Sequence, residues 1–115
     1  MTKATPSYPA LPAVVKDQLK KVGHDLALAR KRRRTSLREM AARMMVNLKT
    51  VQRMEQGDPG VGIGIIASAL WVLGMHRRLG ELAAPETDAT GLQEDIRQLP
   101  RDFRKTKKRE DKYDF

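Results

Sequence analysis

The sequence contains no cysteine and only two histidines. Without cysteine, a disulfide framework and a thiolate metal site are both excluded. The histidines, His24 and His76, are too few for a typical zinc site, and neither has a metal-binding partner one helical turn further along the chain. We therefore expect both to be surface residues, and we expect no bound metal.

The sequence also lacks a long uninterrupted apolar run. The longest stretch, from Ile63 to Met75, is broken by Gly64, Ser68 and Gly74, whereas a membrane-spanning helix needs about 18 or more consecutive apolar residues. The first twelve residues, MTKATPSYPALP, contain no apolar segment typical of a signal peptide. We therefore expect a soluble cytoplasmic protein with no membrane partner.

Residue constellations typical of enzymes are missing as well. The sequence shows no nucleophile paired with a base, no carboxylate pair suited to acid–base catalysis and no glycine-rich phosphate loop. Gly60, Gly62 and Gly64 alternate, but they lack the dinucleotide-binding spacing and follow no predicted strand. We interpret them as a flexible entry to a helix, and we expect neither enzymatic activity nor a cofactor.

Positive charge is what the sequence has in excess. The 23 lysines and arginines outnumber 14 acidic residues, which gives a net charge of +9. Residues 1–34 hold nine basic and two acidic residues, and the basic residues are densest in the run from Arg30 to Arg34. Such a balance favours a polyanionic partner, with nucleic acid ahead of a membrane surface.

The chain divides by composition into three parts, which together predict an all-α protein. Residues 1–13 hold three prolines and are typical of an extended arm. Residues 14–84 carry apolar residues at helical spacing and form the expected five-helix domain. Residues 85–115 are rich in charge, and we expect a largely disordered tail with one weak helical stretch from Leu92 to Leu99.

The first, fourth and fifth of these helices are predicted from their apolar spacing. The first ends near Arg33, the fourth extends from about Ile63 to Leu73, and the fifth from about Met75 to Leu82, before Pro85. The expected inner face of the first helix consists of Val15, Leu19, Val22, Leu26 and Ala29. The expected inner face of the fourth consists of Ile63, Ile66, Ala67, Leu70 and Leu73.

The second and third helices are short and carry recognisable caps. Ser36 is followed three residues later by Glu39, which is the spacing of a capping box at the start of the second helix. Asn47 is the candidate N-cap of the third helix. Val51 and Met54 are the expected inward residues of that third helix.

The segment from Thr35 to Gly57, TSLREMAARMMVNLKTVQRMEQG, resembles the helix-turn-helix of the Xre/Cro repressor family. Met40-Ala41 stands where this family has Leu-Ala, and Thr50-Val51 matches its Ser/Thr-Ile/Val pair. The ending Arg53-Met54-Glu55-x-Gly57 matches Arg-Ile-Glu-x-Gly. The resemblance implies an Xre/Cro-like DNA-binding domain whose third helix enters the major groove.

Two positions depart from the family pattern, and one charged residue needs a partner. Met45 stands at the turn, where the family usually has glycine because φ must be positive. We expect either a left-handed Met45 at a cost of ~1 kcal/mol or a turn of different build. Leu37 replaces a phosphate-contacting glutamine, for which Arg38 or the run from Arg30 to Arg34 is the expected substitute. Glu55 is expected to be structural, either at a helix end or paired with an arginine such as Arg30.

The resemblance also assigns candidate DNA-binding residues. In the major groove, lysine can donate to guanine, glutamine can pair with adenine, and leucine can contact a thymine methyl group. The candidates for base contacts are Leu48, Lys49, Gln52 and Arg53, of which Arg53 is also suited to phosphates. The candidates for phosphate contacts are Ser36, Arg38, Arg43, Asn47 and Thr50.

A narrower resemblance, over about residues 22–101, is to HipB-type antitoxins encoded beside HipA-type kinases. It rests on Met54 to Met75, MEQGDPGVGIGIIASALWVLGM, and on the tail from Leu92 to Arg101. It implies a homodimeric repressor that binds palindromic operators of its own operon and associates with a HipA-type kinase toxin. The candidate dimer residues are Trp71, Val72, Met75 and Leu79. Trp71 fits equally well as a lid that closes the core over the fifth helix.

Two other functions remain open at this point. One is a stand-alone, phage-type repressor with no toxin partner. The other is a protein-interaction subunit whose helix-turn-helix has lost DNA binding, an alternative that the departures at Leu37 and Met45 support.

Overall fold

The computed structural model describes residues 10–100, and every regular element among them is a helix. The predicted all-α class is therefore confirmed for this part of the chain. The chain separates into two compact units between Leu79 and Gly80, and each unit is described by itself. Residues 1–9 of the expected arm and residues 101–115 of the expected tail lie outside the described residues.

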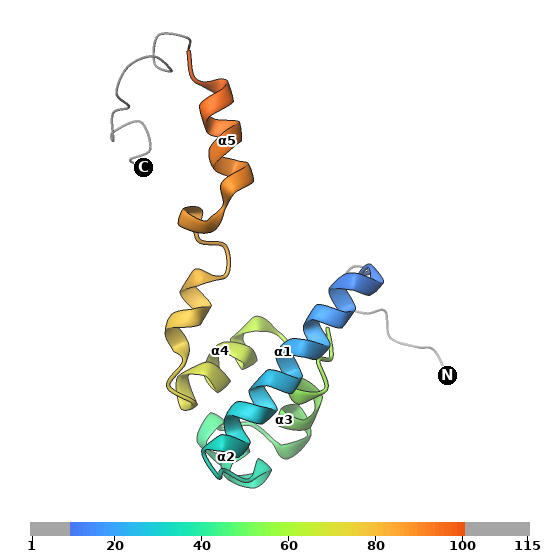
Figure 1. Ribbon diagram of the computed structural model, residues 1–115. Coiled ribbons are helices and arrows are strands. Elements are labelled where there is room, and N and C mark those ends of the chain that lie inside the picture. Colours follow the sequence, from blue (N-terminus) through green and yellow to red (C-terminus); the bar gives the residue numbers. More distant parts are fainter. Residues whose placement is uncertain (1–9, 101–115) are drawn as a thin grey trace. The chain divides into compact units, whose positions relative to one another are not determined.

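The first unit contains a long helix followed by three shorter ones (Figure 1). α3 packs against both α1 and α2, and α4 packs against α2. All four lie close to the predicted bounds. They are α1 (Ala13–Arg32), α2 (Leu37–Met44), α3 (Leu48–Glu55) and α4 (Ile63–Val72).

The core of the first unit lies where these four helices meet. Its side chains are at most 7% exposed, and Val51 on α3 is completely buried. Full burial of one such side chain contributes roughly 1.5–3 kcal/mol. The predicted inward residues of α3 are confirmed. The buried set comprises Leu26, Ala29, Met40, Ala41, Met44, Val51, Met54, Ala69 and Leu73.

The N-terminal half of α1 is less buried than the sequence predicted. Leu26 and Ala29 are buried, but Val15 and Val22 are 38% and 43% exposed. α1 passes close to the end of α3 at Gly23, where an added Cβ would lie 2.6 Å from the backbone oxygen of Glu55. Because α3 has only eight residues, it can support only the part of α1 that crosses it.

α4 also differs from its prediction at one end. Ala69 and Leu73 are buried, but Ile63, which was expected in the core, is 65% exposed. The fully buried positions belong to the C-terminal half of this helix and the residue after it. The first turn of α4 therefore projects beyond the core.

The chain after α4 remains helical, but with shorter and tighter elements than expected. The predicted fifth helix is a 3-10 helix, η1 (His76–Glu81), which spans the boundary between the two units. In the second unit, the 3-10 helix η2 (Pro85–Thr87) precedes α5 (Ala89–Gln98), whose N-terminus is capped by the carboxylate of Asp88. The helical stretch predicted from Leu92 to Leu99 is thus present as α5, which begins three residues earlier, at Ala89, and ends at Gln98.

Candidate nucleic-acid interface

Three residues connect α2 to α3, and backbone hydrogen bonds hold this connection. Met45 has φ 60° and ψ 41°, the left-handed conformation considered for this position. Its N–H donates to Ala42 O at 3.1 Å, and the N–H of Val46 donates to Ala41 O at 3.0 Å. These bonds satisfy carbonyl groups at the end of α2, so the turn forms without glycine.

Both short helices begin at the predicted caps. Ser36 Oγ accepts from the N–H of Glu39 at 3.0 Å, and Glu39 Oε1 accepts from the N–H of Ser36 at 2.9 Å. These hydrogen bonds with Ser36 hold the pKa of Glu39 below its usual value. Asn47 Oδ1 accepts from the N–H of Thr50 at 2.8 Å and from its hydroxyl at 2.9 Å. Two predicted phosphate contacts, Ser36 and Asn47, therefore also cap helices, and a third, Thr50, donates its hydroxyl group to the Asn47 cap.

A buried ion pair joins α1 to α3. Arg30 Nε and Nη2 donate to the two carboxylate oxygens of Glu55 at 2.7 and 3.0 Å, and its Nη1 donates to Thr35 O at 2.8 Å. The bond to Glu55 raises the pKa of Arg30. The predicted pairing is confirmed, and it removes Arg30 from the exposed basic run that was expected to substitute for a phosphate contact.

The outer face of α3 is polar and exposed. Lys49, Gln52 and Arg53 all lie on this face, whereas the remaining candidate for a base contact, Leu48, is half-buried. The side chains of Lys49 and Gln52 form no hydrogen bond or ion pair with any residue that the structure describes. Their donor and acceptor groups are therefore available to a ligand.

Arg53 has a partner that the sequence analysis missed. Its Nε donates to Asp58 Oδ2 at 2.8 Å, while Asp58 Oδ1 accepts from the N–H of Gly60 at 2.8 Å. The bonds from Arg53 and Gly60 hold the pKa of Asp58 below its usual value. The sequence did contain a signal for this pair. Asp58 is an acidic residue five positions after Arg53, and it directly follows Gly57, where the helix was expected to end.

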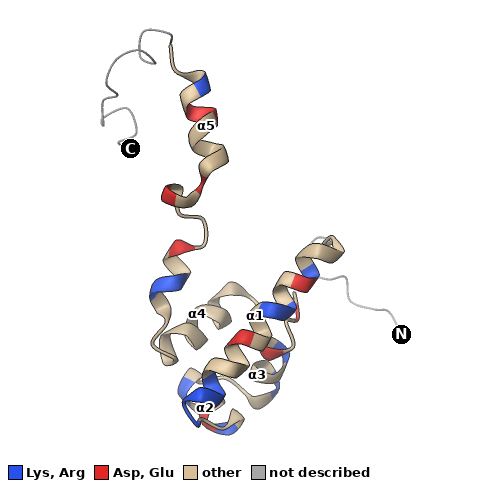
Figure 2. Cartoon of the chain, in the orientation of Figure 1, with Lys and Arg blue, Asp and Glu red and all other residues tan. Residues whose placement is uncertain are grey.

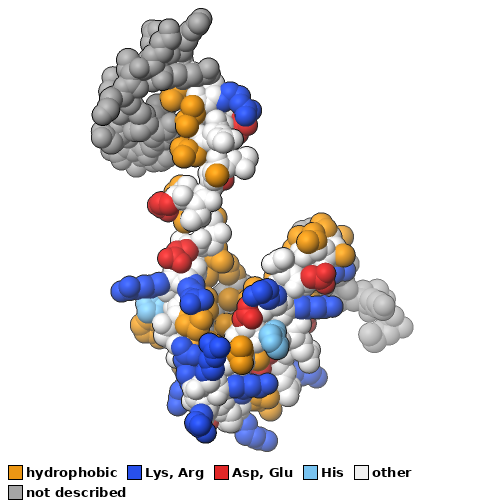
Figure 3. All heavy atoms as spheres, in the orientation of Figure 1, with side chains coloured by type: hydrophobic (Ala, Val, Ile, Leu, Met, Phe, Trp, Pro, Cys, Tyr) orange, Lys and Arg blue, Asp and Glu red, His pale blue; other side chains and the backbone are white. Residues whose placement is uncertain are grey.

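Lysine and arginine residues gather around α2 and the adjoining end of α1 (Figure 2), and basic side chains cover this end of the first unit in Figure 3. Arg38 and Arg43, two predicted phosphate contacts, are both exposed. Arg33 Nη1 donates to Ala29 O at 2.8 Å, so this arginine also caps the end of α1. Residues 10–79 contain 14 basic and five acidic residues, which makes the first unit strongly basic.

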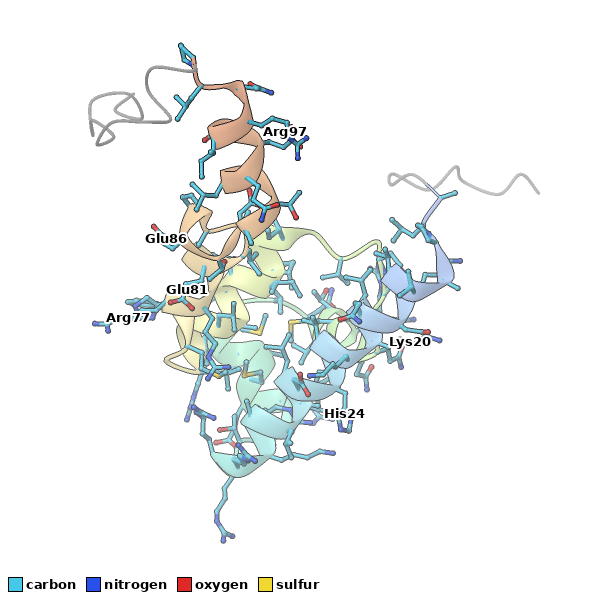
Figure 4. All side chains as sticks on the ribbon, turned by 45° about the horizontal axis from the view of Figure 1, so that its top comes forward. Lys20, His24, Arg77, Glu81, Glu86 and Arg97 are labelled. Atoms are coloured by element: carbon cyan, nitrogen blue, oxygen red, sulfur yellow. The ribbon has the colours of Figure 1, made fainter. Side chains whose placement is uncertain are left out.

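Neither histidine belongs to a metal site within residues 10–100, where no group of three or more His, Cys, Asp or Glu side chains could hold a metal ion. His24 and Lys20 project from α1 one helical turn apart (Figure 4), and His24 and His76 are both exposed, as predicted. No described helix is both long enough and apolar enough to cross a membrane.

The chain finds no match among protein-family models, curated proteins or solved structures. The residues that can act together are thus identified by their geometry. They are the exposed polar face of α3, the basic side chains of α2 and the end of α1, and the Arg53–Asp58 pair.

A second exposed surface of the first unit is apolar and lies on α4. Residues 59–75 include no charged side chain, yet only Ala69 is fully buried among the ten residues of α4. Trp71 is 68% exposed, with its ring centroid 4.9 Å from that of His76. Trp71 therefore does not close the core of the single chain. The other dimer candidates, Val72, Met75 and Leu79, are half-buried.

Proposed function

We propose that this protein is a sequence-specific DNA-binding protein in which α2 and α3 form an Xre/Cro-like helix-turn-helix. The exposed polar face of α3 carries the proposal, because its Lys49 and Gln52 have no partner among the described residues. A solvated polar helix face is common. Here, however, it belongs to a unit that combines strong positive charge with two well-capped helices joined by a three-residue turn.

The dimensions and chemistry of α3 suit the major groove. Eight residues of α-helix are about 12 Å long, and the groove is wide enough to admit a helix. Lys49 can donate to guanine O6 or N7, and the amide of Gln52 can pair with adenine. Arg38 and Arg43 on α2 are exposed and suited to the flanking phosphates.

The same proposal includes a homodimer that represses transcription by occupying an operator. Helix-turn-helix dimers read two half-sites about 34 Å apart, which gives affinity that one short helix does not reach. The uncharged α4 supports this part, since a helix that is apolar on all sides is normally buried, and Trp71 is largely exposed in the single chain. We expect Trp71, Val72, Met75 and Leu79 to lie in the dimer interface.

The kinase partner rests only on the resemblance to HipB-type antitoxins, which is carried mainly by Met54–Met75. Co-expression with the product of a neighbouring kinase gene, followed by purification of a complex, separates an antitoxin from a stand-alone repressor. Sequence-specific binding to DNA separates both from a subunit that acts only through protein contacts.

Selection from a random DNA duplex library tests the central proposal. The enriched duplex and a scrambled version are then compared by fluorescence anisotropy at several salt concentrations. We expect Lys49→Ala to weaken binding to the enriched duplex by about 1–3 kcal/mol. Lys16→Ala removes the same charge from an exposed position on the first turns of α1, and we expect it to leave the discrimination between the two duplexes unchanged.

A different result would contradict the proposal. Equal and weak binding to both duplexes, abolished by moderate salt, would show that the net charge of +9 acts alone. The exposed face of α3 would then be an ordinary solvated surface.

A further inference from the structure

Asp58 is attached to the end of α3 through both its backbone and its side chain. Its N–H donates to Arg53 O at 3.1 Å, and its Oδ2 accepts from Arg53 Nε at 2.8 Å. Gly57, with φ 73°, makes the turn that returns the chain to the last turn of the helix. The carboxylate is held from its other side as well, since Oδ1 accepts from the N–H of Gly60.

This arrangement leaves part of the Arg53 side chain accessible. The side chains of Arg53 and Asp58 are 45% and 33% exposed, and only Nε of the guanidinium group is bonded to the carboxylate. The terminal Nη donors remain on the polar face of α3. Because an arginine forks its donors in a fixed plane, fixing Nε also limits the directions in which the Nη atoms can donate.

We propose that Asp58 is a specificity-determining residue that lowers the affinity of Arg53 for DNA phosphates in general. The inference rests on the proposed DNA-binding function. The adjacent carboxylate neutralises the guanidinium charge and repels phosphate, so contact with the backbone of unrelated DNA gains little. At the selected sequence the oriented Nη donors can still form hydrogen bonds to base acceptors, because a hydrogen bond requires a defined donor–acceptor geometry.

Two further observations support this role. Glu55 is the one other acidic residue in the segment from 47 to 62, and it is bound to Arg30. In that segment, Asp58 is therefore the acidic residue whose negative charge is partly exposed beside α3. The hydrogen bonds from Arg53 and Gly60 lower the pKa of Asp58, so its carboxylate stays ionised at neutral pH.

Asp58→Asn tests the inference because the amide oxygen of asparagine can still accept from the N–H of Gly60, whereas the negative charge and the acceptor for Arg53 Nε are lost. Asp25→Asn is the matched control. It removes the same charge from another ion pair of similar length, Lys21–Asp25 at 2.7 Å, on the surface of α1. Each variant is measured on the enriched and scrambled duplexes over a series of salt concentrations, in full-length protein whose folding is checked by circular dichroism.

We expect Asp58→Asn to tighten binding to the scrambled duplex by about threefold, the scale of an exposed ion pair. Binding to the enriched duplex should change less, so the ratio of the two affinities falls. One additional phosphate contact should steepen the salt dependence on scrambled DNA by about 0.9 in the log–log slope. Asp25→Asn should change neither the ratio nor the slope, and Arg53→Gln should abolish the effect of Asp58→Asn.

The inference is overturned if Asp58→Asn leaves the affinity ratio unchanged, or if it acts equally in the wild-type and Arg53→Gln backgrounds. An equal effect of Asp25→Asn would overturn it too, because net charge would then account for the change. These results are distinct from failure of the proposed function, in which the wild-type protein enriches no sequence at all.

Discussion

Arg30 on α1 binds both carboxylate oxygens of Glu55 at the last residue of α3, at 2.7 and 3.0 Å. The side chains are only 8% and 11% exposed. The same guanidinium group donates to the carbonyl of Thr35, just before α2. One side chain thus ties the end of α1, the entry to α2 and the end of α3 together, and it limits how α3 can be presented to a ligand.

Removing one member of this pair should destabilise the fold. Glu55→Leu leaves the Arg30 charge buried without its partner, and we expect the free energy of unfolding in urea to fall by about 3 kcal/mol. Arg30→Met should have a comparable effect for the same reason. The double variant should lose less than the sum of the two single variants, whereas strict additivity would show that the pair is not coupled.

Gly23 should not tolerate a side chain. A Cβ at this position would lie 2.6–2.7 Å from backbone atoms of residues 54, 55 and 57, which cannot rotate away as a side chain can. We expect Gly23→Ala to lower the free energy of unfolding by roughly 1–3 kcal/mol. Gly64 on α4 has no atom within 4 Å of an added Cβ, so Gly64→Ala should instead stabilise the helix by roughly 0.5–1 kcal/mol. Equal effects at both positions would refute the close approach of α1 to α3.

Met45 should be better replaced by glycine. Its left-handed backbone is unfavourable for a residue with a Cβ, and its side chain is 90% exposed, so little packing is lost. After subtracting the entropy that glycine gains in the unfolded chain, we expect Met45→Gly to raise the free energy of unfolding by about 0.5–1 kcal/mol. Met45→Ala keeps the Cβ and should change stability little; a gain equal to that of glycine would show that the backbone is not the cause.

Trp71 reports directly on the proposed dimer because it is the single tryptophan of the chain. We expect its fluorescence emission to shift to shorter wavelength as protein concentration rises, since association removes an exposed indole from water. Trp71→Glu should give a monomer in sedimentation velocity. Val14→Glu changes a residue of similar exposure, 65% against 68%, at the start of α1 and should remain dimeric; a monomeric wild-type protein at all concentrations would exclude the dimer.

The capping box of α2 should make folding sensitive to acid. Hydrogen bonds to Ser36 lower the pKa of Glu39 below its ordinary value of 4.5. The contribution of Glu39 to the free energy of unfolding is therefore complete above the ordinary pKa. It is lost as the pH falls through the lower pKa that Glu39 has in the folded state. Between about pH 5 and 3, the free energy of unfolding of Glu39→Gln should depend less steeply on pH than that of the wild type. Identical slopes would show that the carboxylate is not held by the cap.

Local features of this protein follow from neighbouring residues and were therefore predictable. The capping box of Ser36 with Glu39, the N-cap at Asn47 and the inward positions Val51 and Met54 depend on contacts within three or four residues. The pairing of Arg30 with Glu55 was also expected, because a charged residue among core neighbours needs a partner. The sequence by itself thus determined the all-α class, the bounds of the four main helices and the polar outer face of α3.

The tertiary structure alone decided how far each apolar face is covered. Val22 and Ile63 satisfy the helical spacing as well as Leu26 does, yet they are 43% and 65% exposed. Val22 is exposed although its neighbour Gly23 is buried against the end of α3. The tertiary structure also decided that Asp58 contacts Arg53, because this contact depends on the path of the turn that Gly57 makes. Periodicity shows which residues share a face of one helix, but burial depends on the length and position of the helix that packs against it.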